Sequence, residues 1–250
     1  MRLILLPLFL ALLTFFSFKN ESPNQTFSTC QLFSPLDSGL VAHYTFNQCD
    51  ATDETGGGSD GVIFGNPGCR CGVEEDALWL DGVNDYLEFP GRVNKFFNTM
   101  DFTVSFYFRS VGYSVFSQSM LGKRADCDEY LQFDTQLDLN KREVNTDFFE
   151  SPDKFYRDIS PETDTSEWMH FALVREGTHV FTYINGSLRK EGIKCSGVDI
   201  SNDVVLSFAN SPCLESGRVV RFKGGLDEMR VYDRALSEEE IGKLYALNPV

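Results

Sequence analysis

The segment Gly225–Glu240, GLDEMRVYDRALSEEE, decides the predicted fold. Leu226–Tyr232 alternates apolar and polar side chains over most of its length, which predicts a strand with one buried face. Ser237 and Glu240 form a capping-box pattern, in which each side chain bonds the backbone amide of the other residue at the start of a helix. Ile241, Leu244 and Tyr245 then fall on one face of a helix. The segment therefore predicts a strand followed by a short C-terminal helix.

The rest of the chain reads as short strands separated by turn residues. Phe102–Arg109 is the clearest strand, because it is rich in β-branched and aromatic residues. Trp168–Arg175 and Thr178–Ile184 flank Glu176-Gly177 and predict a hairpin. Asn185-Gly186 then predicts a type I′ turn into the next strand, since both positions need positive φ. Further strands are expected at 40–46, 62–64, 77–80, 86–89, 204–208 and 219–222. The pattern predicts an all-β sandwich or jelly roll.

Composition narrows the function class. The chain has 250 residues, with 22 Lys and Arg against 37 Asp and Glu, which gives a net charge of −15. A nucleic-acid partner is not expected, because such proteins need a basic face to neutralise phosphates. Hydrophobic residues make up 42% of the chain and Phe alone supplies 23 residues, which is enough to form a core.

The N-terminus predicts export. Met1 and Arg2 precede an apolar run over 3–18, and a polar stretch follows it. We interpret residues 1–22 as a signal peptide or an N-terminal anchor, because the run is shorter than the ~20 residues of a comfortable membrane span. Residues 23–37 form an extension and 38–247 a domain. Beyond the N-terminal segment no membrane insertion is expected, and the sequence leaves the oligomeric state open.

Export makes disulfides the expected state of the seven cysteines, with one left over. Cys49 lies near Cys69 and Cys71, and Cys195 lies near Cys213, so we expect both groups to form local loop staples. Zinc held by Cys69 and Cys71 is the alternative, but zinc ligand pairs usually have about two or more residues between them.

Seven segments in order resemble the laminin-G-like branch of the concanavalin A-like lectin/glucanase superfamily. They are 39–46, 60–62, 80–89, 102–106, 168–174, 183–186 and 225–240. The resemblance extends over about 38–247 and implies a two-sheet antiparallel jelly-roll sandwich of some dozen strands. It implies a secreted or cell-surface binding domain, whose partner is a glycan or an extracellular protein, often with a calcium ion. We expect a non-catalytic module of this kind. A glycoside hydrolase and a structural protein-interaction domain are the alternatives.

Glu162, Asp164 and Glu167 fit the Glu-x-Asp-x-x-Glu signature of laminarinase-type glycoside hydrolases in the same superfamily. Retaining chemistry needs carboxyl groups about 5–5.5 Å apart, which strand residues on one sheet face provide. Here the motif follows Pro161 and has no strand alternation. We therefore interpret it as a solvated acidic loop.

Calcium is the cofactor that the resemblance implies, as a structural ion. Ca²⁺ takes about six to eight oxygen ligands, and a flexible acidic loop can supply several of them. The resemblance points to Asp53 in the Gly-rich loop and Asp227 in the late strand. Asp50, Asp60 and Asp81 are weaker candidates. The alternative is that these acids cap their own turns.

Ligand contacts are expected in the middle segment, which does not follow the family pattern. Its acidic stretches are 126–129 and 147–158, and its candidate ligand-binding aromatics are Tyr113, Tyr130, Phe149 and Tyr156. Trp168 and His170 share one strand face. Trp168 is expected in the core, with His170 as a hydrogen-bonded neighbour rather than a catalytic base.

Overall fold

The computed structural model describes residues 35–160, 164, 166–193 and 197–250. The predicted signal peptide, most of the N-terminal extension, Cys30, Glu162 and Cys195 lie outside this set. No helix of the described part is long and apolar enough to cross a membrane.

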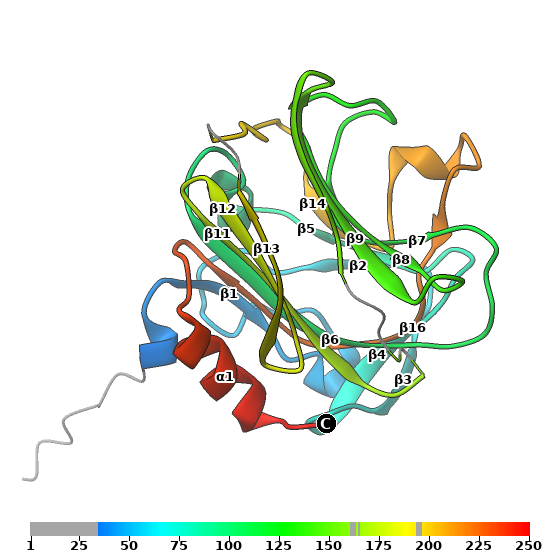
Figure 1. The fold of residues 1–250 in the computed structure, drawn as a ribbon. Coiled ribbons are helices and arrows are strands. Elements are labelled where there is room, and N and C mark those ends of the chain that lie inside the picture. The colour runs from blue at the N-terminus through cyan, green and yellow to red at the C-terminus, as the bar shows by residue number, and fades with distance from the viewer. Residues whose placement is uncertain (1–34, 161–163, 165, 194–196) are drawn as a thin grey trace, which may run out of the picture. The chain divides into compact units, whose positions relative to one another are not determined.

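The described chain forms a two-layer jelly-roll sandwich of eight strands per sheet (Figure 1). Sheet A has the order β13-β12-β11-β6-β16-β4-β3, and β1 also pairs with β16. Its strands are β1 (Leu40–Tyr44), β3 (Gly68–Cys71), β4 (Asp76–Asp81), β6 (Phe102–Ser110), β11 (Met169–Glu176), β12 (His179–Ile184), β13 (Ser187–Ile193) and β16 (Lys223–Tyr232). The long strand β16 is the one that the segment 225–240 predicts.

Sheet B has the order β10-β9-β8-β7-β14-β5-β2. Its strands are β2 (Val62–Phe64), β5 (Tyr86–Phe89), β7 (Gln118–Lys123), β8 (Gln132–Asp138), β9 (Glu143–Ser151), β10 (Lys154–Ile159), β14 (Leu206–Phe208) and β15 (Val220–Arg221). Only β15 is parallel to its neighbour, β7; the other pairs are antiparallel. Strands β7–β10 lie in the middle segment, where the sequence pattern predicted no strands.

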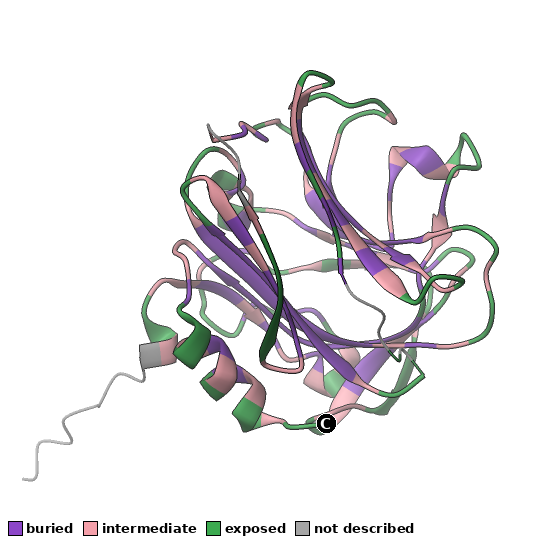
Figure 2. Ribbon diagram, in the orientation of Figure 1, coloured by how far each residue is buried: buried purple, intermediate pink, exposed green. Residues whose placement is uncertain are grey.

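The core lies between the two sheets. Alternate residues of each strand point inward, so Phe106, Phe171 and Phe208 meet there with many other aromatic and aliphatic side chains. Figure 2 shows the buried residues along the strands and the exposed residues mainly in the connecting loops.

Helix α1 (Glu238–Leu247) packs on the outer face of sheet A. Ser237 accepts from the amide of Glu240 and the Glu240 side chain accepts from the amide of Ser237, which confirms the predicted capping box. Ile241 and Leu244 join a second apolar cluster with Ala172, Tyr183 and Tyr232 of the sheet. Short 3-10 turns are η1 (Pro35–Asp37), η2 (Asn47–Cys49), η3 (Arg92–Phe96) and η4 (Pro212–Leu214).

The predicted hairpins of sheet A are confirmed. Asn185 and Gly186 both have positive φ (50° and 71°), and Ile184 pairs with Ser187 across this turn. His170 is buried as expected, with Ser105 Oγ 2.7 Å from its Nε2. Trp168 differs from expectation, because its half-buried indole packs against Trp79 on the outer face of sheet A, outside both apolar clusters.

The cysteine pairing differs in part from the local staples that the sequence predicts. Cys49 is bonded to Cys69, within one of the expected groups. Cys213 is bonded to Cys127, 86 positions earlier, and so cannot pair with Cys195. Strand pairing brings these distant loops together, which sequence proximity does not reveal. Cys71 is the free, exposed cysteine of the described residues.

Candidate ligand-binding groove

A row of polar side chains crosses three neighbouring strands, β8–β10, on the outer face of sheet B. Asp134 of β8 pairs with Gly122 of β7 and Asp147 of β9, and Asp147 pairs with Arg157 of β10. The neighbours of these residues along each strand, such as Phe133, Phe148 and Tyr156, point into the core. Because side chains alternate between the faces of a sheet, the polar row points outward.

Arg124 and Asp134 form a buried ion pair at one end of this row. Arg124 Nη1 lies 2.7 Å from Asp134 Oδ2, and their side chains are 8% and 1% exposed. Arg124 also donates to the carbonyls of Asp126 and Asp128, so it fixes the β7–β8 loop. Burial raises the pKa of Asp134, and the attraction of Arg124 partly counters this effect. Such a pair gives a fixed, desolvated polar wall.

Arg157 provides a second fixed cation. Its Nε and Nη2 lie 2.8 and 3.2 Å from the two carboxylate oxygens of Asp147, and Nη2 lies 3.6 Å from Glu129. The hydrogen bonds that Arg157 donates to Asp147 raise the pKa of Arg157. A two-point contact of this kind orients both planar groups and leaves the remaining N–H and lone pairs open to solvent.

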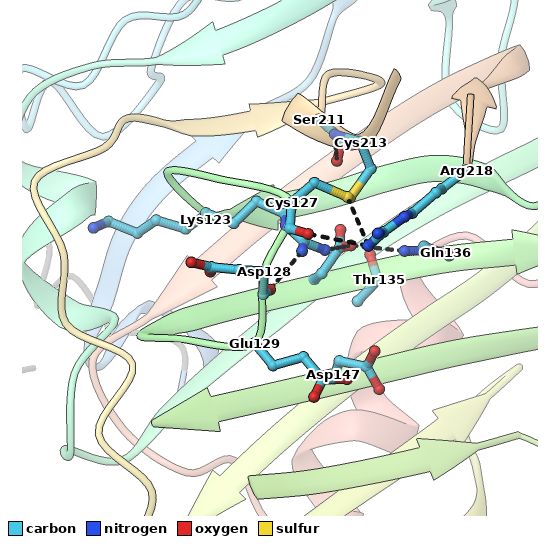
Figure 3. A network of polar contacts seen from close by, with 12 residues as sticks. Lys123, Cys127, Asp128, Glu129, Thr135, Gln136, Asp147, Ser211, Cys213 and Arg218 are labelled. Atoms are coloured by element: carbon cyan, nitrogen blue, oxygen red, sulfur yellow. Dashed lines mark hydrogen bonds and ion pairs between the residues drawn. A yellow bond between two sulfur atoms is a disulfide. The ribbon is translucent and has the colours of Figure 1, made fainter. Parts of the chain in front are cut away.

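The disulfide forms the far wall. Cys127, in the β7–β8 loop, is bonded to Cys213 of η4, and Arg218 donates to the carbonyl of Cys127 at 3.1 Å. Figure 3 shows the disulfide, Arg218 and Gln136 close together, with Asp147 and Glu129 nearby. Two loops far apart in sequence are thus held over one sheet face.

These residues line a groove of about 300 Å³, which we call the β7–β10 groove. Its lining includes Arg124, Asp128, Glu129, Gln132, Gln136, Asp147, Arg157 and Arg218. Gln132 is 2% exposed, and its Oε1 has no hydrogen-bond partner; the same is true of Oδ1 of the buried Asp134 beneath. Buried acceptors without partners are rare in proteins. The lining therefore offers both hydrogen-bond donors and acceptors, and its three arginines are matched by three carboxylates.

The predicted ligand-binding aromatics divide into two groups. Tyr130 is 56% exposed and follows Glu129 in the groove wall, and Tyr113 is 77% exposed in the β6–β7 loop. Tyr156, in contrast, is 5% exposed in the core, and Phe149 is 1% exposed beneath Phe155 and Arg157. Strand alternation and stacking thus cover the rings of Phe149 and Tyr156, whereas Tyr113 and Tyr130 present theirs to solvent.

Asp53 holds its own loop together. Its oxygens accept from the backbone amides of His43, Thr55 and Ser59 and from the Thr55 hydroxyl, and Asp60 accepts from the amide of Asp53. The loop bonds one edge of β1, while β16 pairs with the other edge.

Asp227 is fully buried on β16 and accepts from the amides of Val73, Glu74 and Glu228. Burial raises its pKa to about 7. Asp50 and Asp81 accept from amides of their own turns.

The structure describes the hydrogen bonds of the predicted calcium residues, and calcium binding at them stays a prediction. The only set of three possible His, Cys, Asp or Glu ligands among the described residues is Cys49, Cys69 and Asp76, and its two cysteines are disulfide-bonded. In the described structure, Asp53 binds backbone amides of its own loop and of β1, and Asp227 binds the backbone amides of Val73 and Glu74.

Two members of the acidic motif lie in an exposed segment before β11. Glu167 is 77% and Asp164 68% exposed, with Arg109 3.9 Å from Glu167 and Arg142 4.0 Å from Asp164. Hydrogen bonds from Ser166 lower the pKa of Asp164. The loop placement agrees with the solvated acidic loop expected from the sequence for these two residues.

Sequence reasoning found the segment but missed the residues that build the groove. Arg124, Asp134, Gln136 and Arg157 were not singled out. The alternation of Gln132, Asp134, Gln136 and Asp138 with Phe133, Thr135 and Leu137 was the available signal, since it predicts one polar face.

Comparison with known proteins finds a family. A laminin-G-type family model, described as concanavalin A-like lectin/glucanases superfamily, matches residues 81–242. No curated protein sequence matches the chain significantly.

Solved structures with a similar fold include domain 4 of AbnA, a GH43 extracellular arabinanase from Geobacillus stearothermophilus, in complex with arabinotriose. It is 20% identical with a TM-score of 0.61, and the match covers 83% of this chain and 98% of that domain. The binding domain of Paraclostridial Mosquitocidal Protein 1 is 17% identical with a TM-score of 0.66, covering 83% and 52%. The binding domain of botulinum neurotoxin DC, in complex with rat synaptotagmin II, is 11% identical with a TM-score of 0.65, covering 86% and 52%. The chain thus spans about half the length of these toxin domains, and at these identities the likeness concerns the fold.

Proposed function

The chain belongs to the concanavalin A-like lectin/glucanases superfamily, and we propose on this premise that it is an exported, non-catalytic module that binds a neutral carbohydrate in the β7–β10 groove. The two disulfides support export, because such bonds persist in oxidising compartments. A fold alone does not assign a ligand, so the proposal depends on the groove.

The observation that carries the proposal is the fixed array of donors and acceptors over strands β7–β10. Arg157 and Asp147 hold each other in a two-point contact, and Gln132 Oε1 is buried without a partner in the lining. Sugar hydroxyls both donate and accept, so they can bond such paired groups at once. The lining holds three arginines (Arg124, Arg157 and Arg218) and three carboxylates (Asp128, Glu129 and Asp147), and Arg124 and Arg157 each contact a carboxylate, so the groove favours an uncharged ligand.

The comparisons support a binding module in general. One similar structure carries arabinotriose and another carries a protein, synaptotagmin II. A structural protein-interaction domain is therefore the alternative from a different class. A carbohydrate-binding module and a protein-interaction domain differ in their ligands, and the glycan array described below distinguishes them.

A glycoside hydrolase is the second alternative. Retaining hydrolysis needs two carboxyl groups held about 5–5.5 Å apart, which strand residues on one sheet face provide, and Glu167 lies before β11 rather than on a strand. The exposure of Asp164 and Glu167 also argues for a solvated loop. Incubation with β-glucans tests this alternative; release of reducing sugar that is lost in Glu167→Gln would favour it.

Calcium support is the remaining prediction from the resemblance. Melting curves with calcium and with a chelator test it. A rise in Tm with calcium that disappears in Asp227→Asn would favour an ion, whereas superimposable curves would leave Asp227 as a clamp of the 73–74 backbone.

The experiment that tests the proposal is a glycan array probed with the folded domain, with and without calcium. We expect binding to neutral oligosaccharides that is lost in Arg157→Gln. Arg189→Gln is the matched control, because Arg189 is an exposed arginine on β13 of the other sheet. An array without a positive spot, or equal binding by Arg157→Gln, would contradict the groove assignment.

A further inference from the structure

A second pocket lies on the outer face of sheet A, away from the β7–β10 groove. Trp79 of β4 lies between the inward-pointing Leu78 and Leu80, so its indole points outward. Its cross-strand neighbours are both glycines, Gly68 of β3 and Gly225 of β16. These glycines leave room beside the indole for the side chains of Trp168 and Arg70.

Gly225 is required at this position. A Cβ atom there would lie 2.5 Å from Trp168 and 3.2 Å from Trp79. The absent side chain lets Trp168 approach Trp79 edge-on, with ring centroids 5.9 Å apart. The only two tryptophans of the chain thus share one surface. Trp79 Nε1 is buried and has no hydrogen-bond partner.

Next to Trp79 lies a pocket of about 280 Å³, which we call the Trp79 pocket. Its lining includes Arg70 and Lys223, which are both exposed. The Arg70 guanidinium lies 5.1 Å from the centre of the Trp79 ring. The ring holds this cation in place without using its N–H donors, which stay available to a ligand. Lys223 shares the outer face, because it pairs with Asp81 in the strand register that pairs Gly225 with Trp79.

The two carboxylates that line this pocket, Asp81 and Asp85, accept hydrogen bonds from backbone amides. Asp81 accepts from the amides of Val83, Asn84 and Asp85, and Asp85 accepts from the amides of Asn66 and Asp81. Within the described residues, neither Arg70 nor Lys223 forms an ion pair with a carboxylate. The pocket thus holds two cations whose N–H donors face no carboxylate among the described residues, beside a half-buried indole and two carboxylates that accept from backbone amides.

We propose that the Trp79 pocket is a second carbohydrate site, selective for a saccharide that carries a carboxylate or a sulfate. The indole packs against the C–H face or edge of the sugar ring, and Arg70 and Lys223 bind the anionic group. The two sites thus differ in ion pairing: Arg124 and Arg157 of the β7–β10 groove each contact a carboxylate, whereas Arg70 and Lys223 of the Trp79 pocket do not among the described residues.

The test uses tryptophan emission, because Trp79 lines the pocket and Trp168, the other tryptophan, packs against it. The folded protein is titrated with a galacturonic-acid trisaccharide, a sulfated galactose trisaccharide and a neutral galactose trisaccharide. We expect a saturable change with at least one charged sugar, at least about tenfold tighter than with the neutral one. Which charged sugar binds identifies the anionic group. Binding should weaken as salt rises from about 50 to about 500 mM, because exposed charges are screened.

Lys223→Gln and Arg70→Gln should each weaken binding about tenfold. Lys141→Gln removes the same charge from an exposed hairpin of sheet B and should leave binding unchanged. Arg157→Gln should also leave it unchanged, which separates this pocket from the β7–β10 groove. Emission unchanged by both charged sugars, equal affinity for the neutral one, or wild-type affinity in Lys223→Gln and Arg70→Gln would overturn the proposal. Circular dichroism confirms that each variant is folded.

Discussion

His170 is fully buried between the rings of Tyr107 and Tyr245, on the face of sheet A that α1 covers. Burial is the main cause that lowers the pKa of His170 to about 3, and the charge of Arg230 adds to it. The native state therefore keeps this imidazole neutral, whereas the unfolded chain protonates it below its ordinary pKa of about 6.5. Protons bind to the unfolded state first as pH falls.

This difference predicts that acid destabilises the protein through His170. The stability that the neutral His170 contributes is fully present above about pH 6.5. It is lost as pH falls towards 3, with a maximum slope of about 1.4 kcal/mol of unfolding free energy per pH unit. Urea unfolding of wild type and His170→Gln at several pH values between 7 and 4 measures it. We expect the stability difference between the two proteins to shrink with falling pH. Asp227, whose raised pKa acts in the opposite direction, is present in both proteins. Parallel curves would contradict this account.

The buried pair of Arg124 and Asp134 gives a second prediction. Arg124→Leu leaves the Asp134 carboxylate without its cation at 1% exposure, and we expect a loss of about 3–5 kcal/mol in the free energy of unfolding. Adding Asp134→Leu removes the unpaired charge and should restore part of that loss. Chemical unfolding of the two variants measures both effects. A single variant as stable as wild type would show that the pair is not desolvated.

At the scale of elements, the disulfide joins the β7–β8 loop to η4. It closes a loop of 86 residues, and removing such a bond costs about 2–5 kcal/mol. We expect Cys127→Ser with Cys213→Ser to lower stability by this amount and to weaken binding in the β7–β10 groove, whose wall it forms. Thermal unfolding and the glycan array measure the two effects. Cys71→Ser is the control, since Cys71 is free and exposed. Equal stability of the double variant and wild type would exclude a structural role.

Elements specified by local signals were predictable. The turn at Asn185-Gly186 needs two positive φ angles, and the capping box at Ser237 needs two side chains three positions apart, so each can be read from a few residues. Strands β7–β10 were not predicted, although the polar and apolar alternation of residues 132–138 was a usable signal, because this segment does not follow the family pattern. Trp168 was predicted in the core but lies on the outer face of sheet A. The space for its indole is left by Gly225 on β16, a strand far away in the sequence.

At the scale of the whole molecule, the candidate site depends on register. Asp134, Asp147 and Arg157 are about ten or more positions apart, and they meet only because β8, β9 and β10 pair in one order. The sequence located the acidic middle segment but not this row, and it grouped Cys213 with the wrong partner. The family resemblance predicted the fold over most of the chain. It did not predict that Asp53 and Asp227 bind separate backbone amides.

The acidic charge is also distributed unevenly over the molecule. On sheet B, carboxylates and guanidinium groups are paired across strands, whereas on sheet A the Trp79 pocket keeps two cations without acidic partners among the described residues. The net charge of −15 therefore does not show how charged groups are paired on each face. Ligands of different charge are expected at the two faces.

The central claim is that the β7–β10 groove binds a neutral carbohydrate through its paired polar groups. Calorimetric titration of the best neutral oligosaccharide from the array into wild type, Asp147→Asn, Arg157→Gln and Arg189→Gln tests it most directly. We predict that Asp147→Asn and Arg157→Gln each weaken binding at least about tenfold, as expected for losing a charge-assisted hydrogen bond, and that Arg189→Gln binds as wild type does. Equal dissociation constants for all four proteins would contradict the claim.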